Sequence, residues 1–141
     1  MRVLLDTNII LDLVLEREPF VNQAAALWDL HQQNRLDAYV SPITHVNVFY
    51  VVRKLKSREI AEQAVRLILQ GLLVAPVDSA VLWDALASRF KDYEDATQHA
   101  AALAAGLEAI ITRDPKDYRQ ATIPVQTPED FLATPPPETV H

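Results

Sequence analysis

The chain has 141 residues, a formal net charge of −6, 50% hydrophobic residues and 23% charged residues, which is typical of one globular domain and excludes a disordered chain. The absence of cysteine excludes disulfides and thiolate metal sites. No apolar run reaches the ~18 residues that span a membrane, and Asp6 and Asp12 interrupt the apolar region that a signal peptide would need. The acidic charge argues against a simple nucleic-acid-binding module, but not against an enzyme that contacts phosphates through metal ions.

The N-terminal half of the chain alternates between strand and helix patterns. The expected elements are a strand at residues 1–6, helices at 7–16 and 19–34, a strand at 37–41, and helices at 42–56 and 57–71. The apolar run 3–5 is typical of a short buried strand, and Pro19 breaks the first helix. Pro42 suits the first turn of a helix, and Gly71 is a common stop signal.

The C-terminal half continues the same alternation. The expected elements are a strand at residues 72–77, helices at 78–90 and 92–106, strands at 107–112 and 123–126, and a helix at 127–132. Asp78 is placed to cap its helix, and Gly106 to end the alanine-rich one. Residues 134–141 form a Pro-rich tail outside the core.

Alternating strands and helices predict a parallel sheet that is covered by helices. We therefore expect one α/β domain over residues 1–133, without internal repeats or linkers.

Several polar residues are expected to meet at one edge of this sheet. In open α/β sheets, ligands bind at the carboxyl ends of the strands. Asp6 ends the first strand, Asp114 and Asp117 follow the strand at 107–112, and Asn47 lies one turn inside the helix after the second strand. The helix that carries Asp95 leads into the strand at 107–112, so its N-terminus faces the same edge.

This set of side chains indicates a cation site. Clustered carboxylates repel one another unless they are protonated, solvated or neutralised by a cation. Oxygen ligands without cysteine or a histidine pair favour Mg²⁺ or Mn²⁺ over zinc. Such a site suits the hydrolysis of phosphodiesters by an activated water.

The pattern resembles the PIN-domain family of metal-dependent nucleases, particularly bacterial toxin-like ribonucleases of the VapC type. The resemblance covers nearly the whole chain and rests on four motifs in a fixed order: LLDTNIILDL at 4–13, SPITHVNVFYVVRK at 41–54, DYEDATQHAAAL at 92–103 and IITRDPKDY at 110–118. It implies a three-layer α/β/α sandwich, an endoribonuclease that uses Mg²⁺ or Mn²⁺, an RNA substrate, a homodimer and an antitoxin partner. The composition gives the expectation of a cytoplasmic protein that does not contact a membrane.

The resemblance also implies roles for individual residues. Asp6 and Asp95 match metal ligands, and the last acidic position is Asp114 or Asp117, with Asp114 favoured for direct contact. Many members have a glutamate where this chain has Asn47, and a subgroup shares the asparagine. Asparagine offers an amide but no charge, so Asn47 is expected to position water or substrate.

Other side chains near these motifs have structural alternatives. Asp92 suits an N-cap better than catalysis, and Glu94 is either a solvated charge or a supporting group of the site. Arg113 is a candidate substrate contact or the partner of a neighbouring acid. Asp12 is expected at the surface.

Two polar residues complete the candidate set. The hydroxyl of Thr112 is placed to orient a ligand or a water. Asn8 is either a helix-start residue or a supporting group of the site.

Two rival functions differ in class from a nuclease. A binding or scaffold module with this fold but weak chemistry is favoured by Asn47 in place of an acid. A phosphatase-like hydrolase is disfavoured, because no second aspartate stands two residues after Asp6.

Overall fold

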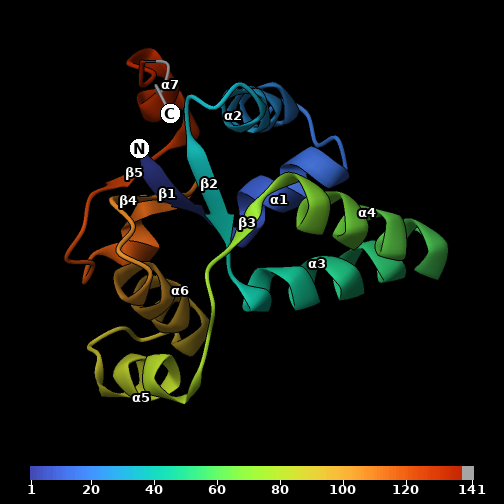
Figure 1. Ribbon diagram of the computed structural model, residues 1–141. Coiled ribbons are helices and arrows are strands. Elements are labelled where there is room, and N and C mark those ends of the chain that lie inside the picture. The colour runs from blue at the N-terminus through green and yellow to red at the C-terminus, as the bar shows by residue number, and fades with distance from the viewer. Residues whose placement is uncertain (138–141) are drawn as a thin grey trace.

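Five strands pair in the order β3-β2-β1-β4-β5, and all four pairings are parallel. The strands are β1 (Arg2–Leu5), β2 (Asp37–Val40), β3 (Leu73–Val74), β4 (Ala109–Ile111) and β5 (Val125–Gln126). Figure 1 shows this computed structural model, which describes residues 1–137.

Seven α-helices and one short 3₁₀ helix surround the sheet within the described residues (Figure 1). They are α1 (Thr7–Val14), α2 (Val21–Gln32), α3 (Pro42–Leu55), α4 (Arg58–Gly71), α5 (Ser79–Ala87), α6 (Tyr93–Ala104), the 3₁₀ helix η1 (Pro115–Tyr118) and α7 (Pro128–Ala133). In residues 1–137, no helix is both long and apolar enough to cross a membrane.

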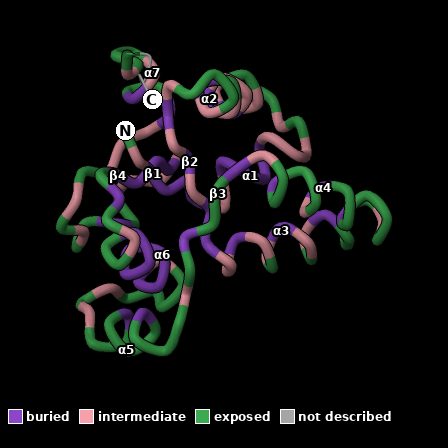
Figure 2. The backbone as a smooth tube through the Cα atoms, viewed as in Figure 1, coloured by how far each residue is buried: buried purple, intermediate pink, exposed green. Residues whose placement is uncertain are grey.

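Side chains that alternate along the strands form two cores, one on each face of the sheet. Val3 and Leu5 share one core with residues of α1, α2, α3, α4 and α7. Leu4 and Ile110 share the other core with residues of α5 and α6. The buried stretches in Figure 2 follow β1, β4 and α6, whereas β3, α4 and α5 are largely exposed. The predicted α/β/α sandwich with a central parallel sheet is therefore confirmed.

Several predicted helix signals are also present. Asp78 caps α5, and Asp92 caps α6, because each side chain accepts a hydrogen bond from a backbone N–H three residues later. Pro42 lies in the first turn of α3. Gly106 follows α6 with a φ of 67°, a left-handed conformation that glycine adopts readily.

Several elements differ from the sequence-based expectation. The helix α5 ends at Ala87 rather than residue 90, and β5 starts at Val125 rather than residue 123. β3 is shorter than residues 72–77, because the Leu72 N–H closes the end of α4 by donating to Ile68 and the neighbouring strand β2 ends at Val40, directly before the cap of α3. β4 starts at Ala109 rather than residue 107, since the Leu107 N–H closes the end of α6 by donating to Ala102. The 3₁₀ helix η1 was not expected.

The predicted boundary at residue 133 stays a prediction. It coincides with the end of α7, and the Pro136 carbonyl of the tail accepts a hydrogen bond from Arg35. Residues 138–141 of the predicted tail lie outside the described residues.

Candidate active site

The carboxyl ends of β1 and β4 form the point at which the order of the strands reverses. The chain passes from β1 outward to β2 and β3, then returns to the other side of β1 with β4 and β5. Such a switch point leaves a crevice in which α/β proteins bind ligands. Asp6 follows β1 and Thr112 follows β4, so both lie at this crevice.

Asp6 is held in place by three hydrogen-bond donors. Its Oδ1 accepts from the Thr7 N–H at 2.8 Å and from the Gln98 side chain at 3.3 Å. Its Oδ2 accepts from the Thr112 hydroxyl at 2.8 Å. The residue is 9% exposed. Because donors from three segments fix the carboxylate, its orientation is set before any ligand arrives.

Gln98 is a supporting residue that the sequence reasoning missed. It is fully buried, donates to Asp6 and to the Thr44 hydroxyl at 2.9 Å, and accepts from the Ser41 hydroxyl. Gln98 follows Asp95 by three residues, which places both on one face of α6. That spacing was the available signal, but the surrounding alanine run obscured it.

The segment after β4 is joined to the start of α1 by Asn8. The Asn8 amide donates to the Thr112 hydroxyl at 3.2 Å and to the Asp114 carboxylate at 3.3 Å. Its carbonyl oxygen accepts from the Arg113 N–H at 3.3 Å. The structure therefore brings Asp6, Asn8, Thr112 and Asp114 together in one hydrogen-bonded group.

Asp95 is the acid whose ionisation is most perturbed. Burial raises its pKa to about 7, and the charges of Asp92, Asp6, Asp117 and Glu94 add to the effect. Charges act on one another in this way only when they are close. Asp95 is therefore electrostatically coupled to Asp6 and to Asp117, whereas Asp114 does not contribute to the pKa shift of Asp95.

Asn47 faces the same edge but contacts Glu94. Its amide donates to the Glu94 carboxylate at 2.6 Å. Burial, Asp92 and Asp6 raise the pKa of Glu94, and this hydrogen bond lowers it. Asn47 of α3 therefore contacts the group of acids through its hydrogen bond to Glu94 of α6.

The Arg113 side chain points away from this group and pairs with Asp12. Its Nε and Nη2 donate to the two carboxylate oxygens at 2.6 and 3.2 Å, and the guanidinium lies 4.0 Å from the centre of the Phe20 ring. The expectation that Asp12 is at the surface is wrong, since it is 1% exposed. Two alternatives were open for Arg113, a substrate contact or an ion pair with an acid. Its contacts support the ion pair.

Tyr118 places a buried hydroxyl next to the acids. The residue is 2% exposed, and its hydroxyl has no hydrogen-bond partner within residues 1–137. Burial raises its pKa, and the charges of Asp6 and Asp95 raise it further.

A comparison with known protein families finds one family that matches most of the chain. A family described as the PIN domain matches residues 2–116. The chain belongs to the PIN-domain family.

Solved structures with the same fold include bacterial toxins. This PIN domain is similar to a toxin–antitoxin complex from Klebsiella pneumoniae, with 28% identity over 89% of this chain and 97% of that one and a TM-score of 0.68. It is also similar to DNA-bound VapBC from Salmonella typhimurium, with 17% identity, coverage of 91% and 98%, and a TM-score of 0.70.

A third similar structure is VapC20 from Mycobacterium tuberculosis, described as a toxin that cleaves the sarcin-ricin loop. Its identity is 15%, the coverage is 82% of this chain and 92% of that one, and the TM-score is 0.66. A search of curated proteins finds no match.

The acids of this PIN domain fit a hydrated hard cation. Their donors are carboxylate oxygens, which Mg²⁺ and Mn²⁺ prefer. In residues 1–137, no three acidic or histidine side chains lie close enough to hold an ion together. Mg²⁺ commonly keeps several waters and takes one or two carboxylates. These carboxylates therefore suit an ion that keeps most of its waters and has few direct protein ligands, rather than an ion enclosed by the protein.

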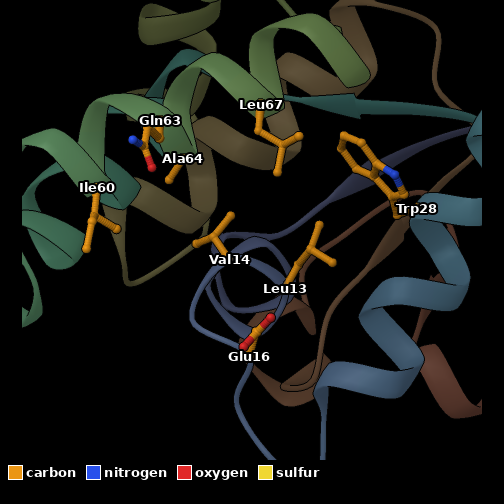
Figure 3. A pocket seen from close by; sticks show the side chains of 8 residues that line it. All are labelled: Leu13, Val14, Glu16, Trp28, Ile60, Gln63, Ala64 and Leu67. Carbon is orange, nitrogen blue, oxygen red and sulfur yellow. The ribbon is translucent and has the colours of Figure 1, made fainter.

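A separate hollow lies away from the acids. It has a volume of about 340 Å³ and is lined mainly by apolar residues of α1, α2 and α4. Figure 3 shows Leu67 of α4 opposite Leu13 and Val14 of α1, with Trp28 of α2 to one side. Apart from Glu16, its lining carries no titratable group, so we assign it no catalytic role.

Proposed function

We propose that this PIN domain is a metal-dependent endoribonuclease and the toxin of a toxin–antitoxin pair. The observation that carries the proposal is Asp6, which three donors orient at the switch point and which is coupled by charge to Asp95. The printed descriptions of similar structures, a toxin–antitoxin complex and a toxin that cleaves the sarcin-ricin loop, support the same function.

In this proposal, Asp6 and Asp95 hold Mg²⁺ or Mn²⁺ directly, and Asp114 or Asp117 contacts the hydrated ion through its waters. When bound, such an ion lowers the pKa of a coordinated water and stabilises charge on phosphate oxygens. Gln98 and Thr112 hold the Asp6 carboxylate in its orientation, and Asn8 holds Asp114.

Asn47 acts through Glu94, to which it donates a hydrogen bond. The pair supports the site from the side of α3, where many family members carry a glutamate.

The deciding experiment compares RNA cleavage by the wild type, Asp6→Asn and Asp29→Asn in Mg²⁺ or Mn²⁺. Asp29 is an exposed acid on α2 and serves as the matched control. We expect the wild type and Asp29→Asn to cleave, Asp6→Asn to lose at least ~100-fold in rate, and excess EDTA to stop cleavage. Cleavage by Asp6→Asn at the wild-type rate would refute the proposal.

The alternative function is a PIN-fold binding module with weak chemistry. It is favoured by Asn47, which adds no charge of its own to the site. Titration of the wild type with Mn²⁺, followed by electron paramagnetic resonance, separates the two. Absence of binding at millimolar Mn²⁺, together with absence of cleavage, would favour the module.

Two protein partners belong to the proposal, an antitoxin and a second copy of the chain. Exposed apolar side chains on α5, including Trp83 at 70% exposure, and the hollow in Figure 3 leave apolar surface for partners. Light scattering coupled to size exclusion tests the homodimer. Co-expression with the product of an adjacent short reading frame tests the antitoxin, whose presence should suppress toxicity and inhibit RNA cleavage.

A further inference from the structure

A second cavity, of about 340 Å³, opens directly beside the candidate metal ligands Asp95 and Asp117. Two segments far apart in the sequence line it, the loop before α6 and the η1 region. Four cations lie along it: Arg89, Lys91, Lys116 and Arg119. We call it the basic cavity.

These cations are available to a ligand. All four residues are exposed, and in the described part of the chain none has a carboxylate within 4.0 Å. The ion pairs found there, Arg58 with Glu62 and Arg113 with Asp12, involve other residues.

Positive charge gathers in this cavity although the chain as a whole is acidic. The protein has 13 lysines and arginines against 19 acids, yet four of the 13 line one cavity. Unpaired like charges repel, so gathering them costs free energy unless an anion binds. Three acids, Asp92, Asp95 and Asp117, also line the cavity, so its cations exceed its acids by one. A metal ion bound at Asp95 would increase this excess of positive charge.

The cavity offers charge rather than a surface for base stacking. Its aromatic residue, Phe90, is half-buried and packs on His99 with ring centres 5.1 Å apart. Contacts from Lys and Arg to backbone phosphates add affinity but carry no sequence information.

We propose that the basic cavity binds backbone phosphates of the RNA strand next to the bond that is cut. This inference rests on the proposed ribonuclease function and names where its substrate is held. The cavity supplies affinity and places the strand against Asp95, while selectivity for a particular sequence comes from elsewhere.

The test measures RNA binding without cleavage. In an Asp6→Asn parent and in EDTA, fluorescence anisotropy follows a fluorescein-labelled single-stranded RNA over a range of salt concentrations. Lys91→Gln with Lys116→Gln removes two of the four charges. Lys54→Gln with Lys56→Gln is the matched control, because these exposed lysines lie at the far end of α3 (Figure 1).

Each phosphate contact to a single strand contributes about −0.7 to the slope of log K against log salt, or roughly fivefold in affinity at 0.1 M salt. We therefore expect the Lys91/Lys116 variant to bind roughly 25-fold more weakly, with a slope reduced by about 1.4. The Lys54/Lys56 variant should bind as the parent does. Thermal melting checks that both variants fold.

Equal affinity and slope in the Lys91/Lys116 variant and the parent would overturn the inference, as would a parent that binds no RNA. If the wild type still cleaves RNA in an Asp6-dependent manner, only the basic cavity is refuted. If RNA binds through these lysines but the wild type cleaves none, the cavity stands and the nuclease proposal fails.

Discussion

The Asn47 amide on α3 donates a 2.6 Å hydrogen bond to the Glu94 carboxylate on α6. The two residues are 47 positions apart, and their contact joins the two helices at the carboxyl edge of the sheet. A family member with a glutamate at position 47 would place two negative charges here. In this chain a neutral donor meets one acid, so the hydrogen bond favours the ionised form of Glu94 and partly offsets the burial that raises its pKa.

Removing this donor should raise the pKa of Glu94. The hydrogen bond favours the ionised carboxylate, and burial, Asp92 and Asp6 oppose it. We expect the pKa to increase from the wild type to Asn47→Ala and again in Asn47→Asp, which adds a like charge. Carbon-13 NMR titration of the Glu94 carboxyl measures it, with Asn22→Ala as a control. An unchanged pKa in both Asn47 variants would contradict the contact.

The position of the site could be predicted from the sequence, because strand ends determine which residues reach the carboxyl edge. That reasoning placed Asp6 and Asp114 at one edge of the sheet, where the structure joins them through the side chains of Thr112 and Asn8. Pairings between side chains could not be predicted in this way. Asp12 and Arg113 are 101 positions apart, and nothing in their local patterns links them.

The role of Gln98 was hidden for a different reason. A lone amide in an alanine-rich helix gives no sequence signal of the three polar side chains that other elements bring to it.

The raised pKa of Asp95 predicts a pH-dependent change in stability. Asp95 binds its proton more tightly in the folded chain, so ionisation opposes folding. The effect is absent below pH 3.8, where both states are protonated, grows as the pH rises to about 7, and is complete above it.

Asp95→Asn removes this effect. In EDTA at pH 8 it should be more stable than the wild type by about 1–2 kcal/mol, allowing for its partial exposure, or roughly 3–8 °C in Tm. At pH 3.5 the wild type and Asp95→Asn should have the same Tm. Mg²⁺ should raise the Tm of the wild type more than that of the variant, since it favours the ionised site. A difference in Tm that does not vary with pH would count against the prediction.

The Arg113–Asp12 ion pair should contribute to stability much more than a surface pair does. Arg113→Gln leaves Asp12, which is 1% exposed, without its cation, and should cost about 3–5 kcal/mol. Combining it with Asp12→Asn should recover part of this loss. Urea unfolding measures both variants.

Arg58→Gln is the matched control, because it breaks an exposed pair with Glu62. It should change the free energy of unfolding by less than about 1 kcal/mol. Equal small losses from Arg58→Gln and Arg113→Gln would contradict the buried ion pair.

Gln98 should act as a positioning residue for Asp6. Gln98→Leu introduces an apolar side chain of similar size. The hydroxyls of Ser41 and Thr44 each lose a hydrogen-bond partner, and the Asp6 carboxylate loses one donor. Each buried polar group that loses its partner costs about 1–3 kcal/mol, so a total loss of about 2–4 kcal/mol is expected in urea unfolding. Gln70→Leu, on the exposed face of α4, should cost less than about 0.5 kcal/mol.

Kinetics separate positioning from a purely structural role. Gln98 contacts Asp6 rather than substrate, so under conditions where Gln98→Leu is folded, kcat should fall with little change in KM. Mn²⁺ affinity, followed by electron paramagnetic resonance, should fall in parallel because the Asp6 carboxylate is less firmly oriented. Wild-type kcat and Mn²⁺ affinity in the folded variant would limit Gln98 to a role in stability.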